Sequence, residues 1–372
     1  MKAILLAAGA STRVYPLTLT RPKPVLPLRN GTILDYTLSL LRDMGKIDEV
    51  IIVVNYKKEM IVDRFGDSYK GMKLTYVDQE EPKGTGHAVL CTEYLFDDYE
   101  GSILVMNGDD LYSREDVSRM LEKFPRVAVK RVTNPSSFGV FEFKNVDGKL
   151  IATGLEEKPR YPKSDMVNVG CYHFGKDIFT YLRKVKPSSR GEIELTDAIM
   201  RYIDWQDLEL TQILDFWIPI GYPWDLLTAN EFMAKLGGEH PKPIISEGVE
   251  IKKNVEITGY SIIGENVKIN NDVKIHNSII MDGAIIGQNS VIKDSIIGED
   301  VFIDRDFTAI SDTESRIRSA VKGGYIEVSR SSFGCAIGDS TKIAKKITVH
   351  PGVKIWPEKD IYNITEVTED IH

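Results

Sequence analysis

Two cations stand near the start of the chain, beside residues small enough to let backbone N–H groups approach an anion. An apolar run ends at Leu6 and is followed by Ala7, Ala8 and Gly9. Arg13 comes next, and Lys23 lies between two prolines, which restrict the backbone on either side of it. Arginine binds phosphate through paired hydrogen bonds, whereas lysine acts as a compact point charge. This segment therefore predicts a strand that leads into a phosphate-binding loop.

The loop differs from the two commonest phosphate-binding signatures. It lacks the terminal Gly-Lys-Ser/Thr of the Walker pattern and the three spaced glycines of the dinucleotide pattern. What remains is a run of small residues, which allows an anion to come close to the backbone. The alternative is an ordinary strand and turn that carries surface cations.

Carboxylates follow two apolar runs further along the chain. Gly108 and Asp109 come directly after the expected strand Ile103–Met106, and Asp225 follows the apolar run Phe216–Ile220. Ligands of parallel sheets bind at the carboxyl ends of the strands, so Asp109 should lie at the sheet edge that carries the opening loop. Each aspartate by itself also fits a turn residue or a helix cap.

The opening segment resembles the signature of the sugar-1-phosphate nucleotidylyltransferases, the enzymes that make nucleotide sugars. The resemblance lies in Leu-Ala-Ala-Gly-x-x-Thr-Arg at residues 6–13 and in Pro-Lys-Pro-Val-Leu-Pro at residues 22–27. Ser11 departs from this pattern, in which glycine is usual. If the loop needs a positive φ at that position, serine costs on the order of 1 kcal/mol there.

The resemblance implies attack of a sugar-1-phosphate oxygen on the α-phosphorus of a nucleoside triphosphate, with release of pyrophosphate. The attacking phosphate is already ionised, so the reaction needs positioning and charge neutralisation rather than a general base. Residues matching Asp109 and Asp225 hold Mg²⁺ in the family, a cation that takes one or two carboxylates together with phosphate oxygens. Lys23 is then expected to meet the phosphates during transfer, and Arg13 the pyrophosphate leaving group.

The resemblance places the nucleotide at the opening loop and at a segment that follows the third expected strand. Gln79 and Gly84 match the glutamine and glycine that hold a pyrimidine base in the family, and Thr85 and Gly108 complete the expected nucleotide site. The run Gly-Thr-Gly-His-Ala at residues 84–88 is similar to that of the uridylyltransferases, so the implied donor is UTP or dTTP. Thr85 also fits a helix N-cap, and the two roles are compatible.

Four residues in the middle of the chain match the sugar-phosphate contacts of the family. Gly139 resembles the glycine that contacts a sugar hydroxyl, Glu157 a glutamate that holds sugar hydroxyls, Lys158 a lysine that meets the sugar phosphate, and Asn168 a further sugar contact. A short acidic and basic run such as Glu157–Lys158 is, in isolation, more often a solvated face. The implied acceptor is glucose-1-phosphate or N-acetylglucosamine-1-phosphate.

The elements that must position these residues alternate between apolar runs and helical patterns. The expected strands are Ala3–Leu6, Val50–Val54, Leu74–Val77, Ile103–Met106 and Val127–Val129. The expected helices are Ile33–Met44, Lys57–Arg64, Gly86–Tyr94 and Arg114–Lys123. This alternation predicts an α/β nucleotidyltransferase domain over residues 1–236, with a Rossmann-like, mainly parallel sheet and helices on both faces.

Isoleucine recurs at every sixth position after a Gly- and Pro-rich linker that begins at residue 237. The first six of these positions are Ile245, Ile251, Ile257, Ile263, Ile269 and Ile275. A period of six fits a three-sided coil in which each flat side points one aliphatic side chain inward. The sequence therefore predicts a C-terminal left-handed parallel β-helix over residues 237–357, as in hexapeptide-repeat proteins.

The repeat has two register shifts and one gap. Its register shifts by one residue at Ile280 and again at Ile297, and the period is absent from about residue 306 to residue 336, where a projecting loop is expected. Residues 358–372 are acidic and are expected to form a C-terminal tail.

Bulk properties narrow the range of partners. The net charge of −8 argues against nucleic acid or an anionic membrane, because either favours a basic surface. The three cysteines (Cys91, Cys171 and Cys335) are far apart and have no metal-ligand spacing, which is typical of a reducing compartment. No stretch reaches the length of a membrane span or of a signal peptide. We expect a cytoplasmic homo-oligomer, a trimer or larger, associated through the flat sides of the coil.

Proteins of this architecture include two other classes. Bifunctional members use the coil as an amino-sugar acetyltransferase, with a histidine base in a Pro-His-x-x-Tyr context, but residues 281–291 contain neither histidine nor tyrosine. Acetyl transfer is therefore disfavoured. Non-catalytic regulatory subunits lose the residues of the transferase site, whereas Arg13, Lys23, Asp109 and Asp225 are all present here, so the resemblance implies an active enzyme.

Overall fold

Strands between residues 2 and 212 form a ten-stranded sheet in the computed structural model, which describes residues 1–188, 191–312 and 316–372. Its order is β10-β11-β13-β9-β12-β7-β1-β4-β6-β5. The strands are β1 (Lys2–Leu6), β4 (Glu49–Val54), β5 (Ser68–Tyr69), β6 (Met72–Asp78), β7 (Ile103–Asn107), β9 (Arg126–Arg131), β10 (Gly139–Val146), β11 (Lys149–Glu157), β12 (Met166–Phe174) and β13 (Glu209–Gln212). Strands β7, β1, β4 and β6 are parallel, so their carboxyl ends share one edge. All five expected strands are confirmed.

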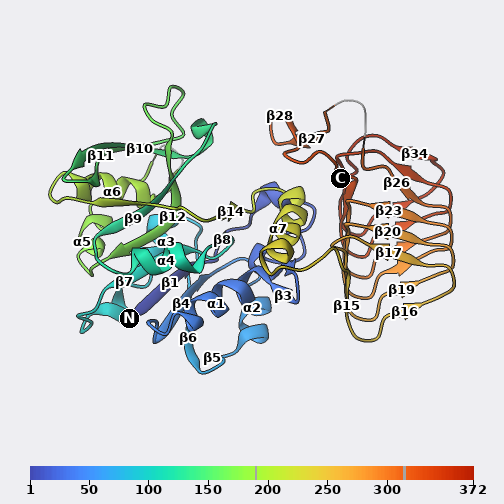
Figure 1. The fold of residues 1–372 in the computed structure, drawn as a ribbon, viewed down its shortest axis with the longest axis horizontal. Coiled ribbons are helices and arrows are strands. Elements are labelled where there is room, and N and C mark those ends of the chain that lie inside the picture. Colours follow the sequence, from blue (N-terminus) through green and yellow to red (C-terminus); the bar gives the residue numbers. More distant parts are fainter. Residues whose placement is uncertain (189–190, 313–315) are drawn as a thin grey trace. The chain divides into compact units, whose positions relative to one another are not determined.

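Helices cover this sheet (Figure 1). They are α1 (Ile33–Asp43), α2 (Lys58–Phe65), α3 (Thr85–Leu90), α4 (Arg114–Met120), α5 (Ile178–Leu182) and α6 (Leu195–Ile203). Every residue of β4 is buried, as expected for a parallel strand covered on both faces. The helix expected over Gly86–Tyr94 ends at Leu90 and is followed by a separate 3-10 turn. Among the described residues, no helix has the length and apolarity that a bilayer crossing requires.

Glu49, at the start of β4, is a buried carboxylate with three side-chain partners. Lys73 Nζ lies 2.7 Å from Oε1, Lys2 Nζ lies 3.2 Å from Oε2, and the Thr75 hydroxyl donates to Oε1 at 2.6 Å. Burial by itself raises the pKa of Glu49, but these partners outweigh it and lower the pKa to about 2. The ionised carboxylate therefore stabilises the fold above its usual pKa of 4.5, and this contribution is lost as the pH falls toward 2.

We expect Glu49→Gln to lower the free energy of unfolding by about 2–3 kcal/mol at pH 7, and by roughly half as much or less at pH 3. Urea unfolding at the two pH values measures both losses. Glu100→Gln is the matched control, because Glu100 also pairs with a lysine, Lys176, but is exposed. Equal losses at the two pH values would contradict the linkage to this carboxylate.

The hexapeptide repeat folds into the expected left-handed β-helix, whose short strands stack as rungs (Figure 1). The first of its three sheets contains β15 (Ile244–Ile245), β18 (Ile262–Ile263), β21 (Ile279–Ile280), β24 (Ile296–Ile297), β29 (Cys335–Ile337) and β32 (Val353–Ile355). The second contains β16 (Glu250–Ile251), β19 (Lys268–Ile269), β22 (Ile285–Ile286), β25 (Phe302–Ile303), β30 (Lys342–Ile343) and β33 (Asp360–Ile361). The third contains β17 (Glu256–Thr258), β20 (Lys274–His276), β23 (Val291–Lys293), β26 (Thr308–Ala309), β31 (Thr348–Val349) and β34 (Glu366–Val367).

The repeating isoleucines fill the inside of the coil. Ile263, Ile280, Ile297 and Ile337 occupy matching positions of neighbouring strands and are fully buried. Three six-residue sides make a turn of eighteen residues. Each of the two register shifts marks a turn that is one residue shorter, and the strands of these turns still stack in register. A buried serine also repeats at one corner, where the Ser278 amide donates to Ser261 Oγ at 3.2 Å and the Ser295 amide donates to Ser278 Oγ at 3.1 Å. Each of these turns thus satisfies a backbone donor of the next one.

The interruption of the repeat and the C-terminal segment both differ in detail from the expectation. The coil continues to β26, where Ala309 takes the inward position of an isoleucine. The insertion that follows carries a hairpin, β27 (Arg318–Val321) and β28 (Gly324–Glu327); residues 313–315 lie outside the described part. Residues 358–372, expected as an acidic tail, contain β33 and β34 of the coil, because Ile361 and Val367 are buried with its core.

Two compact units make up the chain. The first comprises Met1–Ala10 and Ile33–Pro219, and the second comprises Ser11–Thr32 and Ile220–His372. The second unit thus contains both the coil and the segment that carries Arg13 and Lys23. Within that segment, β2 (Pro27–Leu28) and β3 (Gly31–Thr32) form a small antiparallel sheet. The second unit also contains α7 (Pro223–Leu236). This grouping differs from the division after residue 236 that the sequence predicts.

A buried arginine explains why the second unit includes the early segment. Arg21 is 5% exposed and forms ion pairs with Glu299 and Asp339, both in the coil. The Tyr15 and Trp356 rings also meet edge to face, with 6.4 Å between the centroids. The segment therefore belongs to the coil by its packing, although it follows β1 directly in the sequence.

We expect Arg21→Met to destabilise the second unit by about 3–5 kcal/mol, because it leaves a buried carboxylate, Asp339, without its cation. Fluorescence-detected urea unfolding measures the loss. Arg201→Met, which changes an exposed arginine of α6, is the control and should cost little. A loss below about 1 kcal/mol for Arg21→Met, the range of a surface pair, would show that the ion pairs do not hold the segment.

Candidate active site

The first unit brings the opening loop and the Gly108–Asp109 segment to one sheet edge. β1 pairs with β7 so that Leu6 aligns with Asn107, and the Gly108 amide donates to the Leu6 carbonyl at 3.0 Å. The Ala7 amide is held in turn by the Val53 carbonyl of β4, at 2.9 Å. A Cβ on Gly108 would lie 3.1 Å from Leu6 O, so glycine permits this close approach. Ala7 and Ala8 are buried here, and Gly9 is exposed.

The two residues expected at the pyrimidine base contact each other. Gln79 follows β6, is 4% exposed, and donates from Nε2 to the Gly84 carbonyl at 2.9 Å. Gly84 has φ +97°, and a Cβ there would lie 2.7 Å from Ile193 O, so only glycine fits this turn without a shift. Gln79 therefore braces the loop whose backbone is expected at the base.

Thr85 is placed differently from the helix cap that the sequence offers as an alternative. It is the first residue of α3, after the N-cap Gly84. Its hydroxyl accepts a hydrogen bond from the Leu195 amide at 3.1 Å and donates to Glu194 Oε2 at 3.2 Å. The side chain thus caps the start of α6, because the two segments lie side by side at this point.

The residues expected at the sugar gather around the start of β10. Gly139 pairs with Glu157 across β10 and β11. A Cβ on Gly139 would lie 3.1 Å from Glu157 Oε2 and 3.5 Å from Asn168 Cβ, so the three residues are neighbours. Lys158 follows at φ +48°, and its Nζ lies 3.3 Å from Glu157 Oε1 with both side chains well exposed. Asn168 donates from Nδ2 to the Tyr172 hydroxyl at 2.8 Å.

An irregularity in β12 joins this group to the end of β7. The register of β12 against β9 shifts between Asn168 and Tyr172, and Gly170 within the shift has φ +72°. A Cβ on Gly170 would overlap the Asn107 side chain, so glycine lets β12 lie directly against the turn that carries Asp109. The residues expected at the sugar and the turn of Gly108 and Asp109 are thereby placed next to each other.

The neighbour of Asp109 has a structural role. Asp110 is buried, and its Oδ2 accepts hydrogen bonds from Asn107 Nδ2 at 3.1 Å and from Trp217 Nε1 at 3.2 Å. Asp109 is half-buried at the same turn. Of the two adjacent carboxylates, Asp110 thus fixes the turn.

The second unit brings Lys23 and Asp225 together at the start of α7. Lys23 is 6% exposed and donates from Nζ to the Ile220 carbonyl at 2.6 Å. Asp225 lies in the first turn of the helix, where its Oδ2 accepts from the amides of Gly221 and Tyr222 at 3.0 and 2.9 Å. A carboxylate that reaches back to the N-cap is a common start for a helix with proline at its first position. Asp225 is therefore a helix cap, as the structural alternative predicts, with its other oxygen turned away from the cap.

Arg13 lies beside the same helix start. Its guanidinium is 5.7 Å from the centre of the Tyr222 ring, which stacks on the Trp224 ring with 4.8 Å between centroids. Ser11, before Arg13, has φ 49° and ψ 46°, so the position does require the left-handed conformation that glycine favours. Tyr222 was not predicted, although the tyrosine directly precedes the Pro-Trp-Asp helix start. We name Arg13, Lys23, Tyr222 and Asp225 the transfer cluster.

The carboxylate of Asp225 suits a divalent cation. Burial raises the pKa of Asp225 above its usual value, while the Gly221 and Tyr222 amides and the charge of Lys23 act against that rise. A cation supplies the positive charge that such a buried carboxylate lacks. Among the described residues no group of three or more His, Cys, Asp or Glu side chains could hold a metal, so a cation here would need oxygens from a bound phosphate. This donor set fits Mg²⁺.

Comparison with known proteins shows which family the chain resembles over most of its length. Residues 2–235 match the family model described as nucleotidyl transferase, and residues 240–371 match the model described as GMPPB C-terminal domain. The bifunctional protein GlmU of Methanocaldococcus jannaschii is 39% identical over 69% of this chain and 60% of its own length. The chain thus spans about three-fifths of the length of that relative.

Two further similarities cover the chain differently. A bifunctional sugar-1-phosphate nucleotidylyltransferase/acetyltransferase of Sulfurisphaera tokodaii is 31% identical over 100% of this chain and 98% of its own. A crystal structure of UDP-glucose pyrophosphorylase complexed with UDP-glucose matches 63% of this chain and 98% of its own, with a TM-score of 0.57 and 26% identity.

Proposed function

Because the chain belongs to the nucleotidyl transferase family, we propose that it transfers a nucleotidyl group from UTP or dTTP to glucose-1-phosphate or N-acetylglucosamine-1-phosphate. A phosphate oxygen of the sugar attacks the α-phosphorus, the bond from the α-phosphorus to the β-phosphate oxygen breaks, and pyrophosphate leaves. The observation that supports this most is the transfer cluster, in which two cations and a carboxylate meet at one helix start.

The proposed roles are those that the family resemblance implies for the matching residues. Lys23 faces the phosphates undergoing transfer, where a fixed cation stabilises charge as it develops. Arg13, more exposed than Lys23, holds the leaving pyrophosphate through paired hydrogen bonds. Gln79, Gly84 and the opening loop hold the nucleotide, while Gly139, Glu157, Lys158 and Asn168 hold the sugar phosphate. Asp109 and Asp225 would hold Mg²⁺, which neutralises phosphate charge when bound.

The experiment that tests this function is a panel of pyrophosphate-release assays with Mg²⁺. UTP, dTTP, GTP and ATP are each combined with glucose-1-phosphate, N-acetylglucosamine-1-phosphate and mannose-1-phosphate. We expect the highest kcat/KM with UTP or dTTP and one of the first two sugars. No turnover with any pair would instead favour a regulatory subunit.

The name of the Sulfurisphaera relative includes acetyltransferase, so acetyl transfer is the second function to test. We propose no acetyl transfer, because the 281–291 stretch lacks the histidine and tyrosine of that chemistry. Two histidines of the coil have other partners: His276 Nδ1 lies 2.8 Å from Thr258 Oγ1, and His350 Nε2 lies 3.2 Å from Glu366 Oε2. Acetylation of glucosamine-1-phosphate by acetyl-CoA in the presence of the protein would overturn this part.

We also propose that the coil serves assembly into a trimer or a larger homo-oligomer. The flat sides of a β-helix suit cyclic association, and large apolar side chains such as Ile245, Ile251 and Phe302 are exposed on the coil. Sedimentation velocity gives the mass, and a monomer at all concentrations would contradict this.

A further inference from the structure

Helix α7, which carries Asp225 in its first turn, contacts the coil through a hydrogen bond and a ring contact. Asn230 Nδ2 donates to the Tyr260 carbonyl at 2.7 Å, and Asn230 is 2% exposed. Near the start of the helix, the Trp224 and Phe333 rings meet edge to face, with 5.6 Å between the centroids. The helix start is therefore packed against the end of the coil insertion.

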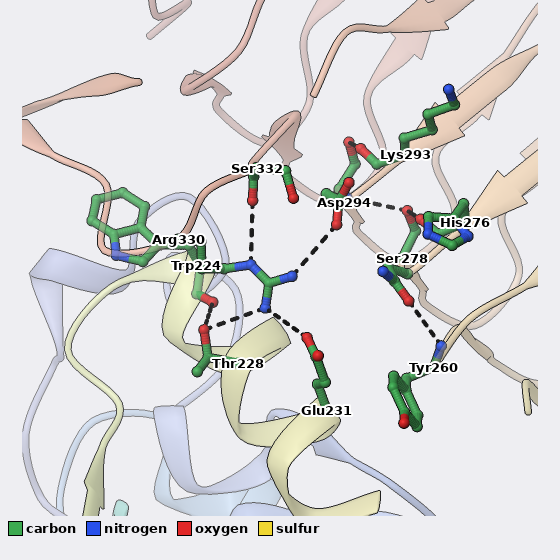
Figure 2. A network of polar contacts seen from close by, with 12 residues as sticks. Trp224, Thr228, Glu231, Tyr260, His276, Ser278, Lys293, Asp294, Arg330 and Ser332 are labelled. Carbon is green, nitrogen blue, oxygen red and sulfur yellow. Dashed lines mark hydrogen bonds and ion pairs between the residues drawn. The ribbon is translucent and has the colours of Figure 1, made fainter. Parts of the chain in front are cut away.

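Arg330, in the same part of the insertion, joins the helix to the coil (Figure 2). Its Nη1 donates to Thr228 Oγ1 at 3.3 Å and lies 3.6 Å from Glu231 Oε2, both on α7. Its Nη2 lies 3.4 Å from Asp294 Oδ1, at a corner of the coil. The Arg330 side chain is 11% exposed and that of Asp294 is 8% exposed, so this bridge is far more sheltered than a surface ion pair.

The residue before Arg330 contacts the carboxylate itself. Ser329 Oγ donates to Asp225 Oδ1 at 3.3 Å. Oδ2 of the same carboxylate is occupied by the Gly221 and Tyr222 amides. The insertion thus provides a hydrogen bond to the oxygen that the helix cap leaves available. Two consecutive residues of the insertion therefore act on Asp225, one directly and one through the helix.

We propose that Ser329 and Arg330 are positioning residues for the transferase site, which fix the Asp225 carboxylate in the orientation that a phosphate-bound cation requires. The coil insertion is then a working part of that site, in addition to any role of the coil in assembly. Partners that orient a metal-binding carboxylate commonly change metal affinity or activity about 10–100-fold when they are removed. The inference rests on the proposed function for Asp225.

The test uses the full chain and two matched pairs of variants. Arg330→Gln is compared with Arg316→Gln, because Arg316 lies on the same insertion and pairs with Glu327 in an exposed ion pair. Ser329→Ala is compared with Ser331→Ala, an exposed serine two residues away. Arg330→Lys retains the charge and is expected to restore part of any loss. Thermal unfolding of each variant shows whether the fold is retained.

Two readouts separate positioning from stability. Binding of Mn²⁺, added as a probe of the cation site in the presence of UTP, is followed by electron paramagnetic resonance without the sugar phosphate and hence without turnover. We expect Arg330→Gln to weaken Mn²⁺ binding and to lower kcat by about 10-fold or more, with the KM for the sugar phosphate within about twofold of the wild type. Ser329→Ala should show a smaller change of both quantities in the same direction, and both controls should match the wild type.

Each outcome decides the proposal. Unchanged Mn²⁺ binding in a folded Arg330→Gln protein would overturn it, and so would a loss of activity that only follows the loss of folded protein. A wild type that binds no Mn²⁺ would overturn it as well. Weaker Mn²⁺ binding by the two variants, in a protein that turns over none of the panel substrates, would support the positioning role and reject the proposed transfer reaction.

Discussion

Replacing Lys23 by methionine is expected to lower kcat for nucleotidyl transfer by about 10²–10³-fold, the usual loss when a preorganised group that stabilises developing charge is removed. Lys23 is a buried cation directed at the Ile220 carbonyl, one residue before the loop that caps α7. Methionine keeps most of the side-chain volume, so the fold should remain. The measurement is kcat and KM for both substrates in the pyrophosphate-release assay.

Two further variants show whether the loss belongs to this lysine. Lys23→Arg retains the charge but replaces a compact ammonium by a planar fork, so we expect it to recover only part of the rate. Lys342→Met, at an exposed position of the coil, should leave the rate unchanged. A Lys23→Met protein with near-normal kcat would remove Lys23 from the proposed chemistry and leave it a structural role at Ile220.

The second large effect is expected for Asp109→Asn, which should reduce the rate by about 10²-fold or more, because an amide replaces one of the two carboxylates that we propose as ligands of the cation. The fold should remain intact, since it is the neighbouring Asp110 that holds the turn through Asn107 and Trp217. The assay is repeated over a range of Mg²⁺ concentrations, and a higher Mg²⁺ requirement is expected for the variant.

The control for Asp109→Asn is Asp147→Asn, in the exposed turn between β10 and β11, where asparagine also tolerates the positive φ of 50°. In contrast to Asp109→Asn, we expect Asp110→Asn to make the protein less stable. Near-normal activity of Asp109→Asn at low Mg²⁺ would exclude this carboxylate from the cation site.

The sequence predicts best those parts of the molecule that repeat. Buried parallel strands appear as apolar runs such as Val50–Val54, and the coil appears as an isoleucine period, because each turn places the same kind of side chain inside. The same period also reaches Ile361 and Val367, six and twelve positions after Ile355. The acidic residues around Ile361 and Val367 made this segment resemble a tail, because outward-facing positions of a coil accept any charge.

Contacts between distant segments could not be predicted in this way. Arg21 and Asp339 are 318 residues apart, and no local pattern marks the arginine as buried. Ser329 and Arg330 lie in a stretch with no period, where only the folded chain shows that they reach α7. The proximity of the candidate site residues within the first unit is easier to predict from the sequence, because strand order and a shared sheet edge determine which residues are neighbours.

The path of the chain limits how this protein can be recombined. The chain passes from one compact unit to the other after Ala10, after Thr32 and after Pro219. An exchange of the C-terminal half at residue 236, the apparent linker, would give Arg21 and α7 foreign partners in place of Glu299, Asp339 and Arg330. A chimera with a related protein should therefore take residues 11–32 and residues 220–372 from the same parent, although the two segments are separated in the gene.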